Sequence, residues 1–154
     1  MAREVQGHFE RVRALAVTPD GRPLVLVGDR AGTSSAVWSL GLDGKSARSA
    51  ALPAHGRAVV AAGHLAVVGA SDGALYGFDL VRDLLEVLRL EGHPGGTTAL
   101  ASFPDGDRVA SAGVDGVGRV GSVGRPAALS AWPPSEAPPR AGAVWPIFRA
   151  RRRS

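Results

Sequence analysis

The stretch that decides the fold of this chain runs Gly7-His8, Thr18-Pro19-Asp20-Gly21 and Leu24-Val25-Leu26-Val27-Gly28, and it returns as Gly92-His93, Phe103-Pro104-Asp105-Gly106 and Val109-Ala110-Ser111-Ala112-Gly113. The Gly-His pair and the Pro-Asp-Gly turn are both displaced by 85 positions. Half of that distance, about 42 residues, lies in the range of about 40–45 residues that is typical of a four-stranded repeat unit. A third, shorter unit lies between the copies, from Ala54-His55 through Gly69-Ala70-Ser71-Asp72-Gly73 to Gly77-Phe78-Asp79-Leu80. The repeat indicates a scaffold of stacked units rather than a catalytic centre.

Short apolar segments between the turns are typical of strands. Pro19-Asp20-Gly21 predicts a tight turn, because proline presets φ, aspartate can bond its own backbone and glycine accepts a positive φ. We predict strands at residues 12–18, 23–27, 36–40, 58–62, 65–68, 75–78, 98–103, 108–112 and 117–123, with a hairpin turn at Gly63-His64. Residues 84–90 suit an outer strand or a helix face, and their position before the second Gly-His pair favours the strand.

Composition limits the class of protein. The chain of 154 residues is one domain or less, and it has no cysteine, which excludes disulfides and thiolate zinc sites. It has no apolar run of about 18 or more residues that would cross a membrane, and its N-terminus lacks the apolar stretch of a secretory signal. We therefore expect a cytoplasmic protein. Residues 1–124 carry 12 Lys or Arg and 13 Asp or Glu, so the positive charge belongs to residues 125–154, with six Arg and one Glu.

The units resemble the WD-repeat β-propeller family, in which each repeat contains Gly-His, Pro-Asp-Gly, an Asp in a tight turn and a strand that ends in Trp-Asp. The matching positions here are Gly7-His8, Val37-Trp38-Ser39, Asp72-Gly73, Phe78-Asp79, Gly92-His93 and Asp115-Gly116. The resemblance implies an all-β fold, a partial β-propeller of about three four-stranded antiparallel blades. The composition changes after residue 124, where repeated prolines deny a strand or helix its N–H donors, so residues 125–154 are predicted to form a disordered Pro/Arg-rich tail. The chain thus divides into residues 1–124, with units at about 7–44, 45–91 and 92–124, and a tail at 125–154.

The resemblance also implies a buried network of His, Ser or Thr, Asp and Trp in each blade, because a buried imidazole needs hydrogen-bond partners. No unit carries all four residue types. The matching residues are His8, Asp29 and Trp38 in the first unit, His55, Asp72 and Phe78 in the second, and His93, Ser111 and Asp115 in the third. Phe78 and Gly121 stand where the family has Trp.

Three units are fewer than the four to eight blades, approximately, that close a propeller. A blade buries its apolar faces only against neighbouring blades, so three blades leave two faces open. We therefore expect either a fragment of a longer propeller or a homo-oligomer in which copies complete the ring. Residues 3–6, Arg3-Glu4-Val5-Gln6, are predicted to be the outer strand of a last blade.

An enzymatic alternative rests on Gly69-Ala70-Ser71-Asp72-Gly73, which matches the G-x-S-x-G pattern of serine hydrolases. Ser71 would be the nucleophile, with His93 and Asp79 as its partners. That pattern requires a helix after the serine, whereas residues 74–78 are predicted to form a strand. The four histidines lack the spacing of a zinc site. We expect no catalytic residue, no metal and no cofactor.

The tail ends in a basic cluster of Arg149, Arg151, Arg152 and Arg153. Such a cluster can bind phosphates or an anionic membrane surface, and the neighbouring Trp145 and Phe148 could stack on bases. The single lysine beside 17 arginines indicates G- and C-rich codon usage, so the arginine content is weak evidence for a nucleic-acid partner.

The sequence therefore predicts a non-catalytic scaffold for protein–protein interaction, built from WD-like repeats. Rigid strands that carry exposed loops are suited to bind a protein partner. The loop residues that are candidates to face that partner are Arg30, Thr33, Arg57, Thr97 and Arg108.

Overall fold

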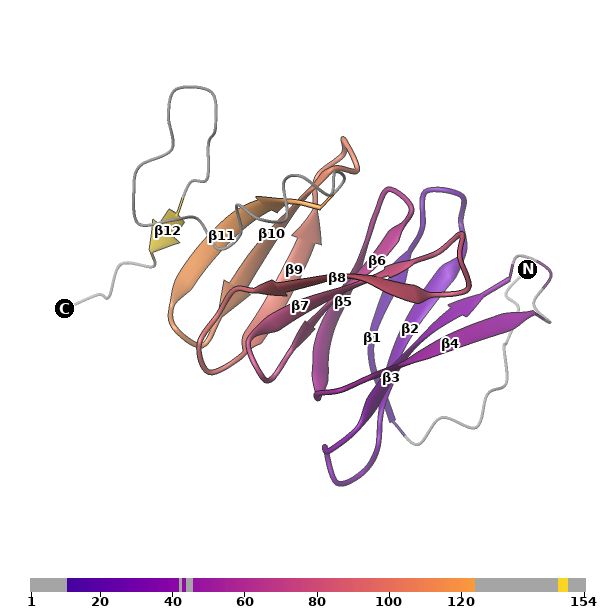
Figure 1. Ribbon diagram of the computed structural model, residues 1–154, viewed down its shortest axis with the longest axis horizontal. Helices are drawn as coiled ribbons and strands as arrows, with labels where there is room; N and C mark the ends of the chain where they lie inside the picture. Colours follow the sequence, from indigo (N-terminus) through magenta and orange to yellow (C-terminus); the bar gives the residue numbers. More distant parts are fainter. Residues whose placement is uncertain (1–10, 42, 44–45, 124–146, 150–154) are drawn as a thin grey trace.

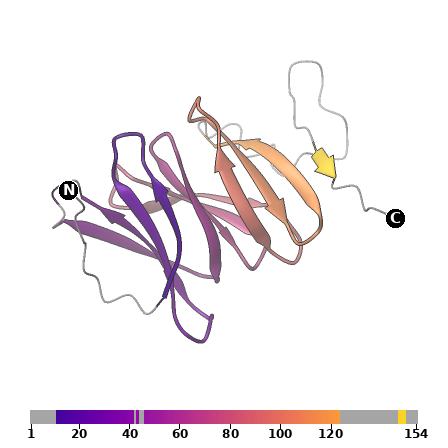
Figure 2. The ribbon, with the colours of Figure 1, turned by 180° about the vertical axis from the view of Figure 1, so that it is seen from behind.

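Three sheets make up the described part of the molecule, which in this computed structural model comprises residues 11–41, 43, 46–123 and 147–149. Each sheet has four antiparallel strands. We call the sheets blades 1, 2 and 3 in chain order, and they stand side by side with blade 2 between blades 1 and 3 (Figures 1 and 2). The prediction of an all-β chain with about three four-stranded blades is therefore confirmed.

The three sheets follow one another along the chain. Blade 1 contains β1 (Arg11–Val17), β2 (Pro23–Gly28), β3 (Ser35–Leu40) and β4 (Ala47–Leu52). Blade 2 contains β5 (Gly56–Ala62), β6 (Leu65–Ala70), β7 (Ala74–Asp79) and β8 (Leu85–Glu91). Blade 3 contains β9 (Thr97–Ser102), β10 (Arg108–Gly113), β11 (Val117–Ser122) and β12 (Ile147–Arg149).

The first strand of each blade lies on the inside of the row, where β5 packs beside both β1 and β9. Each of these three strands carries a register shift against its neighbour, and the extra residues are Arg13, Arg57 and Thr98. Such a bulge bends a strand and increases its twist. The three blades therefore share one construction despite their different sequences.

Two apolar cores hold the blades together. Between blades 1 and 2, side chains such as Leu26 and Val37 pack against Val68 and Phe78, and all four are at most 1% exposed. The core between blades 2 and 3 contains Leu65, Val67, Leu75, Leu88, Leu90, Val109 and Val123. A fully buried side chain of this size stabilises a fold by about 1.5–3 kcal/mol, so both contacts contribute strongly to stability.

Glycines make the tight hairpin turns between the first and second strands. Gly21, Gly63 and Gly106 have φ values of 89°, 57° and 73°, which side chains with a Cβ rarely adopt. The predicted hairpin at Gly63-His64 is confirmed, because it connects β5 to β6. It packs against the corresponding turn of blade 3, where a Cβ on Gly63 would lie 3.0 Å from the carbonyl oxygen of Gly106.

Three segments refine the expectations from sequence. Within residues 84–90, for which a helix was an alternative, residues 85–90 belong to β8 and Leu84 lies in the turn before it. β4 was not predicted, because its sequence ARSAAL lacks the β-branched and aromatic residues that favour strands. β12 lies within the predicted tail and completes blade 3 by pairing with Val117–Arg119 of β11, so residues 147–149 differ from the expectation of a tail outside the blades. The strand predicted at residues 3–6 lies outside the described residues.

Candidate interaction surface

Blade 3 contains a hydrogen-bonded group around a buried histidine. The His93 side chain is fully buried, with Nε2 2.8 Å from the Ser111 hydroxyl and Nδ1 3.1 Å from Asp115 Oδ1. A neutral imidazole with its proton on Nδ1 satisfies both contacts, because it donates to Asp115 and accepts from Ser111. The structure thus brings together all three residues that the sequence placed in the third unit.

Arg119 joins this group from β11. Its Nη1 donates to the carbonyl oxygen of Gly92 and lies 3.2 Å from Asp115 Oδ2. Burial raises the pKa of Asp115, but the hydrogen bond from His93 and the charge of Arg119 help to lower it on balance. Asp115 is therefore held ionised between two donors, and Arg119 takes part in a network from which the family's Trp is missing.

The side-chain hydrogen bonds of blade 2 differ from those of blade 3. Asp72 accepts hydrogen bonds from the Tyr76 hydroxyl and from the backbone N–H of Ala74. Burial, and then the hydrogen bond with Asp72, raise the pKa of Tyr76 to about 12. Nδ1 of His55 has no hydrogen-bond partner among the described residues, so the structure does not join His55 to Asp72. Phe78 is 1% exposed and contributes to the apolar core.

In blade 1, the Asp29 side chain stabilises the turn in which it lies. Its carboxylate accepts hydrogen bonds from the hydroxyls of Thr33 and Ser34 at 2.6 and 2.8 Å, which lower its pKa. Trp38 lies on β3, opposite Val25 of β2 and Ser49 of β4. His8 lies outside the described residues, so its predicted place in the network stays a prediction.

Sequence reasoning missed Tyr76 and Arg119, although a signal for both was present. Each follows the turn aspartate of its blade by four residues, in the pairs Asp72–Tyr76 and Asp115–Arg119. The family pattern draws attention to the Trp position two residues later, where Phe78 and Gly121 stand.

We call one edge of the row the connection face. It contains the turns between second and third strands, at residues 29–34, 71–73 and 114–116, and the connections between blades, at residues 53–55 and 92–96. Backbone hydrogen bonds fix it, since the N–H groups of Gly92 and His93 donate to the carbonyl oxygen of Gly73. The N–H of Ser71 likewise donates to the carbonyl oxygen of His55 at 2.8 Å. Both connections are therefore held to the turn of blade 2 at residues 71–73.

A cleft of about 510 Å³ opens on the connection face, between the turn of blade 2 and the start of blade 3. Arg89 and Glu91 of β8 bring both signs of charge to it, and the Arg89 guanidinium lies 4.9 Å from the centre of the Tyr76 ring. The other polar side chains in its lining belong to Asp72, His93 and Arg119. A cleft of this size with mixed charge can receive a polar peptide segment.

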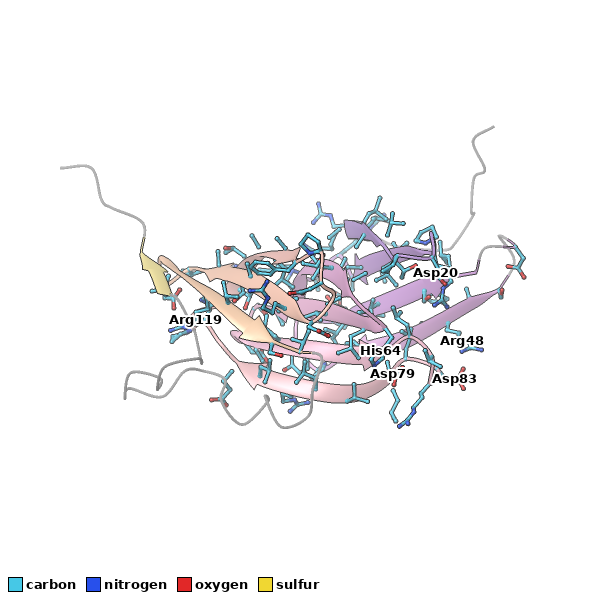
Figure 3. The ribbon with its side chains drawn as sticks, turned by 90° about the horizontal axis from the view of Figure 1, so that it is seen from above. Asp20, Arg48, His64, Asp79, Asp83 and Arg119 are labelled. Atoms are coloured by element: carbon cyan, nitrogen blue, oxygen red, sulfur yellow. The ribbon has the colours of Figure 1, made fainter. Side chains whose placement is uncertain are left out.

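The opposite edge of the row has a different chemistry. There His64, Asp79, Arg48 and Asp83 gather, away from Arg119 (Figure 3). Arg48 Nη1 and Asp83 Oδ1 are 2.7 Å apart but well exposed, and such surface pairs contribute little to stability. Asp79 caps the turn after β7 by accepting from the backbone N–H of Val81 at 2.9 Å.

The hydrolase alternative receives no support from the geometry. Ser71 is followed by β7, a strand, where the nucleophile pattern requires a helix. Within the described residues, no hydrogen bond joins the Ser71 hydroxyl to His93 or Asp79, because these bond Ser111, Asp115 and backbone groups instead.

Other expectations concern partners. In the part of the chain that the structure describes, no three His, Asp or Glu side chains gather as metal ligands, and no helix is long and apolar enough to cross a membrane. Thr97 is 0% exposed, because its methyl group packs on Gly69, so it does not face a partner. The side chain of Arg149 and all of Arg151, Arg152 and Arg153 lie outside the described residues, and their binding of anions stays a prediction.

Comparison with known proteins identifies the repeat. Residues 85–120 match the family model of the WD domain, G-beta repeat. The match begins at β8 of blade 2 and ends in β11 of blade 3, so the repeat extends over two blades. The predicted resemblance to the WD-repeat family is confirmed. The comparison with curated proteins found no match.

Solved structures share the fold. A chain of the "Crystal Structure of Mitotic Checkpoint Complex" is similar with a TM-score of 0.63 and 24% identity over 72% of this chain. This chain spans only 33% of the length of that neighbour. The "computationally designed Ika4 protein" is similar with a TM-score of 0.60 and 25% identity, over 81% of this chain and 77% of the other. The three sheets are thus blades of a partial β-propeller.

Proposed function

We propose that this chain is a non-catalytic scaffold that binds a protein partner on its connection face. The observation that supports the proposal best is the cleft of about 510 Å³, because it is lined by both signs of charge and lies on hydrogen-bonded turns. Loops on a rigid frame bind partners without a large ordering cost.

The lining of the cleft favours a polar segment of a protein. Glu91 is exposed and offers an acceptor beside the guanidinium of Arg89, which is itself 3.2 Å from Glu86 Oε1. The carboxylate of Asp115 and the imidazole of His93 are already bonded to each other, so they act as support rather than as reactive groups. A partner with alternating charge would therefore be recognised at Arg89 and Glu91.

Site-specific photo-crosslinking tests this proposal. A photoreactive amino acid replaces Glu91 in the full chain, and the matched control carries it at Asp107, an exposed acidic residue in the turn of blade 3 at the opposite edge. We expect position 91 to capture one defined protein in extracts of the source organism, and position 107 not to capture it. The variant Glu91→Arg should then reduce binding of that protein, whereas Asp107→Arg should leave it unchanged.

Two outcomes would contradict the proposal. Equal capture at positions 91 and 107 would show that the connection face is not the binding surface. An enzymatic turnover that is lost in a folded Ser71→Ala variant would show that the chain is an enzyme.

A further inference from the structure

Blade 1 exposes an apolar face at one end of the row. Val12, Leu15 and Val17 of β1 are 50%, 67% and 65% exposed. The bulge at Arg13 places all three on the same side of the sheet, away from the core with blade 2. Val59, which faces blade 1 from the corresponding strand β5, is only 5% exposed. The face that is covered on blade 2 is therefore open on blade 1.

Blade 3 exposes a hollow at the other end. Its volume is about 370 Å³, and its lining is apolar. Register pairs Ala110 with Ala101 and Ala112 with Ala99, so four methyl groups lie on one side of the sheet. Leu100 and Phe103 also border the hollow. The same side of blade 2 carries the larger Val60 and Val67 at the positions of Ala101 and Ala110, so blade 3 has space where blade 2 is filled.

The two open faces continue the interfaces that the chain already contains. Within the chain, Thr97 of β9 reaches over β6 of blade 2, where its Cβ would lie 3.0 Å from a Cβ on Gly69. Val12 stands directly before the bulge of β1 as Thr97 stands before the bulge of β9, and Ala112 precedes its turn aspartate by three residues as Gly69 does. Val12 of one chain would thus lie over Ala112 of another as Thr97 lies over Gly69, with the two blades slightly farther apart because Ala112 has a Cβ that Gly69 lacks.

We propose that a second copy of this chain completes the ring, with the Val12, Leu15 and Val17 face of each copy seated in the blade 3 hollow of the other. Bulky side chains meet a hollow lined by alanines, which is the fit that close packing requires. Propellers close with about four to eight blades, and two copies with three blades each give six, whereas three copies would exceed that range. The inference goes beyond the proposed function and does not depend on it.

The mass of the full chain in solution tests the proposal. By light scattering we expect twice the 15.8 kDa of one chain. Leu15→Arg and Ala112→Arg, at exposed positions on the two faces, should each give the mass of one chain with an unchanged circular dichroism spectrum. Val81→Arg is the matched control, because Val81 is 72% exposed but lies in the turn after β7, and it should keep the double mass.

A cysteine cross-link adds a second measurement, since the chain has no cysteine of its own. The double variant Val12→Cys, Ala112→Cys should form disulfide-linked pairs of chains on oxidation, whereas Val12→Cys alone should not. A single-chain mass for the unmodified protein, a mass of three or more chains, or a double mass that persists in both face variants would overturn the proposal. Equal cross-linking of the double and single cysteine variants would overturn it as well.

Discussion

Two glycines in equivalent turns allow the packing between blades to be measured. Gly73 and Gly116 each follow a turn aspartate and have φ values of 89° and 74°. Alanine at either position costs about 1–2 kcal/mol for the left-handed backbone. A Cβ on Gly73 would also lie 2.1 Å from the carbonyl oxygen of His93, whereas a Cβ on Gly116 meets none of the described residues within 4 Å.

The contact at Gly73 cannot relax without loss of hydrogen bonds. The N–H groups of Gly92 and His93 donate to the carbonyl oxygen of Gly73 at 3.1 and 3.0 Å. Overpacking costs about 1–3 kcal/mol, and each hydrogen bond lost adds about 1 kcal/mol. With one of these two hydrogen bonds lost, we expect Gly73→Ala to lower the free energy of unfolding by about 3–6 kcal/mol, and Gly116→Ala to lower it by about 1–2 kcal/mol.

Urea titration followed by circular dichroism measures both changes. Both alanines are introduced into the Leu15→Arg variant, so that a second copy does not cover Gly116. Free energies of unfolding that differ by less than about 1 kcal/mol between the two variants would refute the argument. Such a result would mean that His93 is not packed closely against the turn of blade 2.

Three further predictions concern single side chains. Ser111→Ala should lower the free energy of unfolding by about 1–3 kcal/mol, since it leaves buried Nε2 of His93 without its partner. The control Thr98→Val removes an exposed hydroxyl and should change the free energy of unfolding by less than about 0.5 kcal/mol. Urea titrations measure both variants, and equal effects would contradict the role of Ser111. Tyr76 is the only tyrosine, so the absorbance of tyrosinate should appear near pH 12 in the folded chain and near pH 10 in urea; a midpoint near 10 in both states would show that the hydroxyl is not buried. Burial, and then the charges of Arg13 and Arg57, lower the pKa of His55, so the unfolded chain takes up a proton that folded His55 does not, and stability falls as the pH drops below about 6.5. The melting temperature should therefore fall less in His55→Gln than in the unmodified chain between about pH 7.5 and about pH 5.5, and parallel curves would contradict the assignment.

The turns were predictable because their residues act locally. Pro104-Asp105-Gly106 specifies its own backbone, and Gly106 has the expected positive φ of 73°. β4 was not predictable in this way, because Ala, Ser and Arg have little preference for strands. It is a strand because Ser35–Leu40 of β3 offers a long partner in register. β12 depends likewise on β11.

The candidate site was predictable to the extent that it follows the repeat. The spacing from His93 to Ser111 and Asp115 repeats a family pattern, and the structure brings these side chains together. The partnership of Asp115 with Arg119 departs from that pattern, because the network that the resemblance implies consists of His, Ser or Thr, Asp and Trp. The cleft beside Glu91 arises from two blades, so a single unit read alone gives no sign of it.

The repeat at residues 85–120 starts in one blade and ends in the next. A gene segment of this kind, when duplicated, adds an outer strand to an existing sheet and begins a new sheet with the following three strands. Lengthening of the chain by such duplication therefore never produces a detached blade. The first strand of each added repeat pairs with the sheet of the blade before it. An array of this type can therefore lengthen without evolving a separate contact between the old and the new blades.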